Sequence, residues 1–169
     1  SLVNVNLTGG EPFARKDLID IAECYCRNTS IQSIYITTNG SLPDRVKTFA
    51  EHITKKYPYI TLSISISIDD LPENHNKIRK IKGLFDKCIE TYKLIEKIER
   101  VIPVVQVTVS EANYKNVKKI YFDLLNIYKV DSIKAVIVRD EGIYKTPTED
   151  KRGILNSYNW ITNKIIEDS

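Results

Sequence analysis

The chain has 169 residues, of which 42% are hydrophobic and 28% are charged, and its formal net charge is +3. This length is enough to bury a core, and the composition excludes general disorder, a collagen-like repeat and a disulfide-rich scaffold. No apolar run approaches the roughly 20 residues of a membrane helix, and the first residues are typical of a strand rather than of a signal peptide. We therefore expect one folded cytoplasmic domain with no membrane contact, and the net charge is too small to indicate a nucleic-acid partner by itself.

Short runs of β-branched residues alternate with amphipathic segments along the chain. The runs predict strands over 3–7, 33–38, 60–68, 103–109 and 132–138. The amphipathic segments predict helices over 15–27, 44–56, 83–99, 114–128 and 150–166. Strands and helices that alternate at this spacing indicate βα units and a parallel sheet.

The predicted strands carry apolar and polar residues in alternation, most clearly over 62–68, where aliphatic residues alternate with serines. Helices on both faces of an open sheet require strands that are apolar on both faces, and these strands are not. We therefore predict an α/β fold in which about five βα units form a partial TIM-like barrel of parallel strands with a polar interior. An ordinary open α/β sheet is the alternative.

The cysteines and His75 are weak candidates for chemistry. Cys24 and Cys26 are two residues apart on a predicted helix, so their side chains point about 200° apart. We expect these two and Cys88 to be reduced, partly buried thiols that form no metal site. His75 lies in a predicted loop without a catalytic partner at motif spacing, and the basic residues of 77–82 are expected to form a solvated loop and helix start.

Polar loops follow the carboxyl ends of the predicted strands, over 8–12, 37–40, 67–70, 108–113 and 138–142. In parallel βα folds these loops carry the functional site, although turns favour the same residue types for conformational reasons. Gly9 and Gly10 let backbone groups approach a ligand closely, and Glu11 offers a carboxylate to a cation such as an ammonium. Pro12 stiffens the exit from this loop. Asn39 either caps its turn or contacts a ligand.

The third predicted strand ends in residues suited to a sugar. Ser67 and Asp69 share its polar face, and a hydroxyl and a carboxylate there can bind the paired hydroxyls of a ribose. The competing interpretation is that Asp69 or Asp70 caps a turn. Arg79 is a candidate partner for a ligand carboxylate, because its guanidinium matches the geometry of that group.

The motifs TGGEP, TTNG and SISIDD, followed by HNKIRKIKGLFDKCIETYKLI, resemble the radical S-adenosylmethionine (radical SAM) enzymes. The resemblance covers about residues 7–142 and is closest to the peptide- and protein-modifying (SPASM-type) branch. It implies a six-unit partial barrel in which the first strand of this chain is the second. It also implies contacts with S-adenosylmethionine (SAM). Gly9, Gly10 and Glu11 would hold the methionine amino group, and Thr38 and Asn39 would line the pocket. Ser67 and Asp69 would meet the ribose and carboxylate region, with Arg79 near the carboxylate. Gln106 and Thr108 would border the adenosyl or substrate space, and Val138 and Arg139 would flank the adenine.

For the intact protein the resemblance implies one-electron chemistry. A reduced [4Fe–4S] cluster cleaves SAM, and the resulting 5′-deoxyadenosyl radical removes a hydrogen from a peptide, protein or small-molecule substrate, with an electron donor as a further partner. The C-x-x-x-C-x-x-C loop of the family is absent, and Asp70 and Lys80 stand where the family often has glycine.

We therefore expect residues 1–169 to be an inactive fragment without catalytic residues or metal ligands. Its first barrel strand and the loop with the cluster cysteines would lie upstream of Ser1, and a C-terminal part would be missing. Its open sheet edge could pair with a second copy.

Two other classes stay open. A non-catalytic barrel could hold a nucleotide or metabolite in its polar interior without redox chemistry. A conventional barrel enzyme would need a buried lysine or a phosphate-binding Gly-rich loop late in the sheet, and Lys134 is the strand lysine that lies on a polar face.

Overall fold

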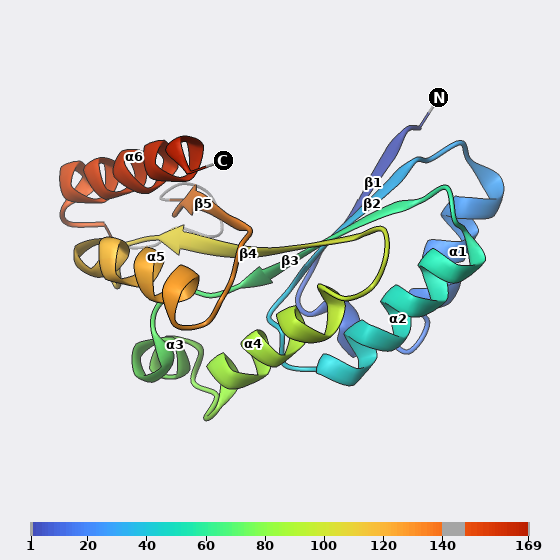
Figure 1. Ribbon diagram of the computed structural model, residues 1–169, viewed down its shortest axis with the longest axis horizontal. Helices are drawn as coiled ribbons and strands as arrows, with labels where there is room; N and C mark the ends of the chain where they lie inside the picture. Colours follow the sequence, from blue (N-terminus) through green and yellow to red (C-terminus); the bar gives the residue numbers. More distant parts are fainter. Residues whose placement is uncertain (1, 140–147, 169) are drawn as a thin grey trace. The chain divides into compact units, whose positions relative to one another are not determined.

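The computed structural model describes residues 2–139 and 148–168, in which strands and helices alternate (Figure 1). The strands are β1 (Asn4–Leu7), β2 (Ser33–Thr38), β3 (Thr61–Ser67), β4 (Val101–Val109) and β5 (Ile133–Ile137). The α-helices are α1 (Leu18–Asn28), α2 (Pro43–Lys56), α3 (Pro72–Arg79), α4 (Leu84–Ile95), α5 (Val117–Asn126) and α6 (Lys151–Glu167), and two 3₁₀ helices cover Pro12–Ala14 (η1) and Tyr114–Asn116 (η2). None of the helices in these two ranges combines the length and the apolar character needed to cross a membrane.

The five strands form one parallel sheet whose spatial order is the chain order, β1-β2-β3-β4-β5. Connections between parallel strands are right-handed in almost all proteins, so an order without reversal keeps every connecting helix on the same side of the sheet. A doubly wound open sheet needs a reversal of strand order to cover both faces. The order therefore confirms the predicted α/β partial barrel over the open-sheet alternative.

The chain divides into two compact units. The first contains residues 1–67 and 86–104, and the second contains residues 68–85 and 105–169. Each is described by itself below. That the chain acts as one domain stays a prediction.

The first unit has an apolar core between its sheet and its helices. The register aligns Ile34 with Leu62 and Ile36 with Ile64, and all four side chains are fully buried. In Figure 1, α1 and α2 lie side by side on one side of these strands. The alternation predicted from the sequence is thus confirmed for the face that meets the helices.

The opposite, polar face of these strands is only partly open to solvent. Tyr35 is exposed on β2, whereas Ser65 and Ser67 of β3 are buried. The polar face that the sequence predicts is therefore covered at the carboxyl end of β3, where the serine side chains are buried.

An ion cluster joins α1 to α2. The buried carboxylate of Glu23 accepts from His52 Nε2 at 2.7 Å, Lys56 Nζ at 2.5 Å and Arg27 Nη1 at 3.0 Å. The hydrogen bonds from His52 and Lys56 lower the pKa of Glu23 to about 2, so this carboxylate is charged at neutral pH. The bonds from His52 and Lys56 to Glu23 thus join α2 to α1.

In the second unit α6 packs against β5, and α5 packs against α6. The register aligns Val105 with Ile133, and the two residues are buried. The Tyr121 hydroxyl donates to Asp168 at 2.8 Å, and burial together with this carboxylate raises the pKa of Tyr121 to about 12. The ring of Trp160 lies edge-on to Tyr121, which ties α6 to α5.

Helix α3 corrects the sequence prediction, which placed a loop here. Pro72 occupies its first turn, where a missing N–H costs nothing. The helix has no apolar stripe, and its one buried residue is His75, so the hydrophobic pattern gave no signal. The basic residues Lys77 and Arg79 lie on this helix and not in a solvated loop.

Helix α3 ends at Lys80, whose φ of 57° is in the left-handed region. Glycine is the preferred residue at such a helix end, and other residues cost about 1 kcal/mol there. We expect Lys80→Gly to raise the free energy of unfolding in urea by about 1 kcal/mol, because the Lys80 side chain is exposed and little contact is lost. Lys77→Gly, inside α3, is the matched control and should lower it by about the same amount. A destabilised Lys80→Gly protein would contradict this account of the helix end.

Candidate functional site

Glu11 organises the loop that follows β1. Its Oε1 accepts from the backbone N–H of Phe13 at 3.1 Å and from the Thr38 hydroxyl at 2.8 Å. Its Oε2 accepts from the backbone N–H of Asn39 at 2.7 Å. One carboxylate thus caps η1 and joins the carboxyl end of β1 to that of β2.

The two glycines of this loop leave its backbone open. Gly9 has a φ of 149°, which side-chain-bearing residues rarely adopt, and Gly10 follows it. A Cβ at either position would meet no atom within 4 Å. Both residues are exposed, whereas Pro12 beyond them is buried. The predicted close approach of a ligand to this backbone is therefore sterically possible.

The structure gives Thr38 and Asn39 supporting roles. Thr38 is buried, and its hydroxyl donates to Glu11 and accepts from the Gly40 N–H at 3.1 Å. The Asn39 Oδ1 accepts from the Ser41 N–H at 2.9 Å, so of the two alternatives left by the sequence this oxygen makes the local cap. Gly40, with a φ of 71°, packs against Cys88 of α4.

In the second unit Asp69 and Arg79 form an ion pair. Arg79 Nε lies 2.5 Å from Asp69 Oδ2, and Arg79 Nη2 lies 3.1 Å from Asp69 Oδ1. The Asp69 side chain is 11% exposed and that of Arg79 is 35% exposed. The sequence assigned these two residues to separate ligand groups, and the structure brings them together as a two-point pair.

Two residues that the sequence did not single out as ligand contacts hold the backbone of Asp69. The Asp69 N–H donates to His75 Nδ1 at 3.1 Å, and the Asp69 carbonyl accepts from Asn113 Nδ2. His75 and Asn113 are almost fully buried. The expectation that His75 is an isolated loop histidine is wrong, because α3 turns it towards Asp69 and Arg79. The sequence carried one signal for this arrangement: if residues 75–79 are helical, His75 and Arg79 are four residues apart and lie on the same face.

Asp70 bonds locally, in the turn before α3. Its Oδ1 accepts from the Leu71 N–H at 2.7 Å and its Oδ2 from Asn74 Nδ2 at 3.3 Å. These bonds fit the interpretation of Asp70 as a turn residue, although the N-cap position of α3 itself belongs to Leu71. Ser67, in the first unit, is the buried last residue of β3.

The remaining predicted contacts lie on β4 and after β5. Gln106 and Thr108 are half-buried. Gln106 is aligned with Lys134, and burial lowers the pKa of Lys134. The Val138 N–H donates to the Val109 carbonyl at 2.9 Å, and Arg139 is exposed. The rest of the fifth predicted loop, 140–142, lies outside the described residues.

The cysteines do not suit an iron–sulfur cluster. Cys24 is exposed, which differs from the expected partial burial, while Cys26 and Cys88 are buried. The Cys88 Sγ donates to the Asn39 carbonyl at 3.2 Å. Among residues 2–139 and 148–168, no three His, Cys, Asp or Glu side chains gather as a metal-ligand set.

The cluster cysteines that the sequence analysis expects upstream of Ser1 are not tested by the structure. Ser1 itself lies outside the described residues, which begin at Leu2. The position of the cluster ligands therefore stays a prediction.

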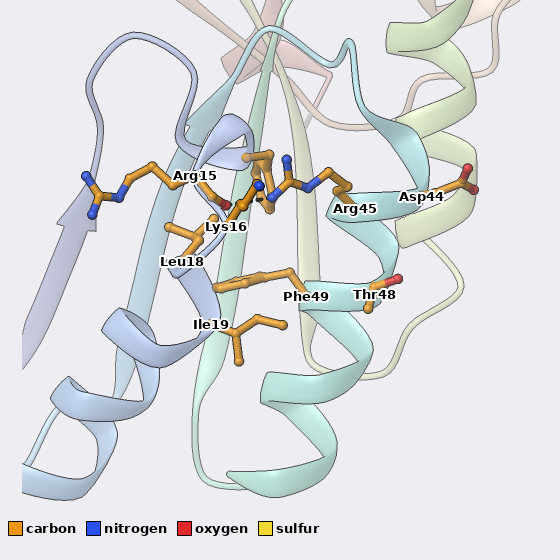
Figure 2. Close-up of a pocket in the computed structure, with 9 residues that line it drawn as sticks. Arg15, Lys16, Leu18, Ile19, Asp44, Arg45, Thr48 and Phe49 are labelled. Atoms are coloured by element: carbon orange, nitrogen blue, oxygen red, sulfur yellow. Dashed lines mark hydrogen bonds between the residues drawn. The ribbon is translucent and has the colours of Figure 1, made fainter.

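A hollow of about 190 Å³ lies on the helical side of the first unit (Figure 2). Phe13 and Phe49, with ring centroids 5.5 Å apart, form part of its apolar wall. Arg45 on its rim donates to the carbonyls of Ala14 and Arg15 at 3.3 and 2.7 Å. None of the predicted ligand contacts lines this hollow.

Comparison with known proteins gives one family. Residues 2–124 match the family model of the Radical SAM superfamily. Fe-coproporphyrin III synthase of Methanosarcina barkeri is 32% identical over 127 residues, which are 75% of this chain and 29% of that protein. GTP 3′,8-cyclase of Clostridium perfringens is 33% identical over 94 residues, which are 51% of this chain and 27% of that protein. The chain therefore spans less than a third of the length of these relatives.

A solved structure shares the fold. Streptococcus suis SuiB superposes with a TM-score of 0.67 over 97% of this chain and 36% of that chain. The sequence identity is 16%, so this likeness supports the fold alone.

Proposed function

Because this chain belongs to the radical SAM superfamily, whose members use SAM and a [4Fe–4S] cluster, we propose that the loop 8–12 binds the methionine end of SAM. The observation that carries the proposal is the Glu11 carboxylate, which holds this glycine-containing loop open at the carboxyl end of β1. The intact protein would be a radical enzyme that acts on a peptide, protein or small molecule and takes an electron from a donor partner. The motifs after β3 favour the peptide- and protein-modifying branch.

The loop has acceptors for an ammonium group. Glu11 Oε2 accepts one described hydrogen bond, from Asn39, and a carboxylate oxygen can accept two. Among the described residues no donor is bonded to the carbonyls of Gly9 and Gly10. These oxygens and the negative charge of Glu11 suit the three N–H donors and the positive charge of the methionine amino group.

The second unit offers acceptors for the ribose. Arg79 occupies two of the roughly four acceptor positions of the Asp69 carboxylate, which leaves two for sugar hydroxyls. Arg79 thereby orients Asp69, and its own remaining donors can meet a carboxylate. Ser67, Gln106 and Thr108 stay proposed neighbours of the adenosyl or substrate space, and Val138 and Arg139 of the adenine.

In this family SAM and the cluster together supply a radical that removes a hydrogen atom from the substrate. The described residues bind and orient SAM but do not provide a ligand set for the cluster, which would need thiolates from outside them. We therefore propose that residues 1–169 alone bind SAM and are catalytically inactive.

Truncation of Glu11 tests the proposal. We expect Glu11→Ala to weaken SAM binding to the 169-residue chain about tenfold, the loss of one charge-assisted contact. Binding of 5′-methylthioadenosine, which lacks the amino acid part, should change much less. Isothermal titration calorimetry with both ligands makes the comparison, and Glu51→Ala, an exposed residue of α2, is the control. Equal losses for the two ligands, or an unchanged SAM affinity, would remove the loop from the binding site.

A further inference from the structure

Helix α3 directs two side chains at Asp69. His75 and Arg79 are four residues apart on this helix and share a face. Arg79 holds the Asp69 carboxylate at two points, while His75 Nδ1 accepts from the Asp69 backbone N–H at 3.1 Å. Asp69 lies two residues beyond Ser67, the last residue of β3, and directly after Ile68, whose N–H still bonds to the Gln106 carbonyl at 3.0 Å. Its N–H is buried and needs an acceptor, which the histidine provides.

The His75 ring is fixed in one orientation and one protonation state. It is fully buried and lies edge-on to the ring of Phe85, with ring centroids 6.0 Å apart. The ring of Phe85 in turn packs against that of Tyr128, with ring centroids 4.8 Å apart. Because Nδ1 accepts a hydrogen bond, the neutral ring carries its proton on Nε2. Burial lowers the pKa of His75 to about 4; the negative charge of Asp69 opposes this shift and the positive charge of Arg79 adds to it. The ring is therefore neutral at physiological pH, and Nδ1 stays an acceptor.

Asn113 holds the other side of the same peptide segment. Its Nδ2 donates to the carbonyls of Asp69 and of Thr108, the latter at 2.8 Å, and its Oδ1 accepts from the Ser110 N–H at 2.8 Å. The N–H and the carbonyl of Asp69 are thus each bonded to a buried side chain from a different segment. Such a fully satisfied buried network fixes the position of Asp69 more tightly than a solvated loop would.

We infer that His75 is a positioning residue for SAM binding. Through its Nδ1 it holds the backbone of Asp69 so that the Asp69 carboxylate meets the ribose hydroxyls, with Asn113 holding the opposite side of the segment. This inference rests on the proposed role of Asp69. His75 itself contacts neither the cofactor nor a reacting atom.

Two substitutions separate the acceptor from the bulk of the ring. In His75→Asn the Oδ1 is attached to Cγ as Nδ1 is, so an acceptor stays within reach of the Asp69 N–H, although the ring is lost. In His75→Leu an apolar side chain fills the space and no acceptor is left. Both variants should be less stable than the wild type because they lose the contact with Phe85. We expect His75→Leu to weaken SAM binding about fivefold, the effect of one lost hydrogen bond, while His75→Asn stays within about twofold of the wild type.

The experiment measures SAM affinity of the 169-residue chain by calorimetry for the wild type, both His75 variants and Asp69→Asn. Hydrogen exchange of the Asp69 amide, followed by NMR, is the second measurement and should be faster in His75→Leu than in His75→Asn. Equal SAM affinities for the two His75 variants would overturn the role of the acceptor. If Asp69→Asn weakens binding but neither His75 variant does, the inference falls and the proposed role of Asp69 stands. If Asp69→Asn leaves the affinity unchanged, the proposed role of Asp69 falls, and the inference falls with it.

Discussion

Replacing Gly40 by alanine should lower the free energy of unfolding by about 3 kcal/mol, the combined cost of a left-handed backbone and of overpacking. Gly40 has a φ of 71°. A Cβ there would lie 2.9 Å from Cys88 Sγ, 3.0 Å from Cys88 Cα and 3.1 Å from Ile66 Cγ2. Because one of these atoms is backbone, rotation of a side chain cannot relieve the contact, and either β2 or α4 must shift.

Gly83→Ala is the matched control for this prediction. Gly83 has the same φ of 71°, but a Cβ there would meet no atom within 4 Å. Gly83→Ala should therefore lower the free energy of unfolding only by the conformational penalty of about 1 kcal/mol. Urea denaturation of both variants measures the difference. Equal losses of stability would contradict the packing of Cys88 against the turn that follows β2.

Replacing Arg79 should cause the second large loss in the free energy of unfolding. Arg79→Met keeps most of the aliphatic stem but leaves the Asp69 carboxylate, 11% exposed, without its ion-pair partner. Breaking a buried pair in this way costs about 3–5 kcal/mol, and we expect about 2 kcal/mol here because the Arg79 side chain is 35% exposed. Asp69→Asn should cost less, about 1 kcal/mol, since the guanidinium left behind can reach water.

The double variant Asp69→Asn/Arg79→Met tests whether the cost comes from the unpaired carboxylate. Removing the charge should make the double variant more stable than Arg79→Met alone. Chemical denaturation of the wild type and the three variants gives the coupling energy. Additive losses would show that the two residues act independently, contrary to the two-point pair.

The fold was predictable because the sequence repeats one pattern. Alternation over 62–68 predicted the buried aliphatic face of β3, and Leu62 and Ile64 are fully buried there. Helix α3 was not predictable from periodicity, since it is short and polar and its only buried side chain is that of a histidine. The burial of Ser65 was also missed, because the pattern predicts which face a residue is on but not what covers that face.

The candidate site was predictable by residue type and less so by role. The sequence identified Glu11 as a carboxylate near a ligand, but its bonds to Thr38 and Asn39 join residues far apart in the chain. For the same reason Asp69 and Arg79 were identified singly and not as a pair. Sequence spacing does not show such contacts until the strands are placed in register.

The central claim is that SAM is held by the loop that Glu11 anchors. An NMR titration of the ¹⁵N-labelled 169-residue chain with SAM tests it directly. The account predicts saturable shifts of the backbone amides of Gly9, Gly10 and Asn39, with smaller shifts on titration with 5′-methylthioadenosine. Saturable shifts that leave these three amides unmoved, and fall instead on residues such as Trp160 of α6, would contradict it.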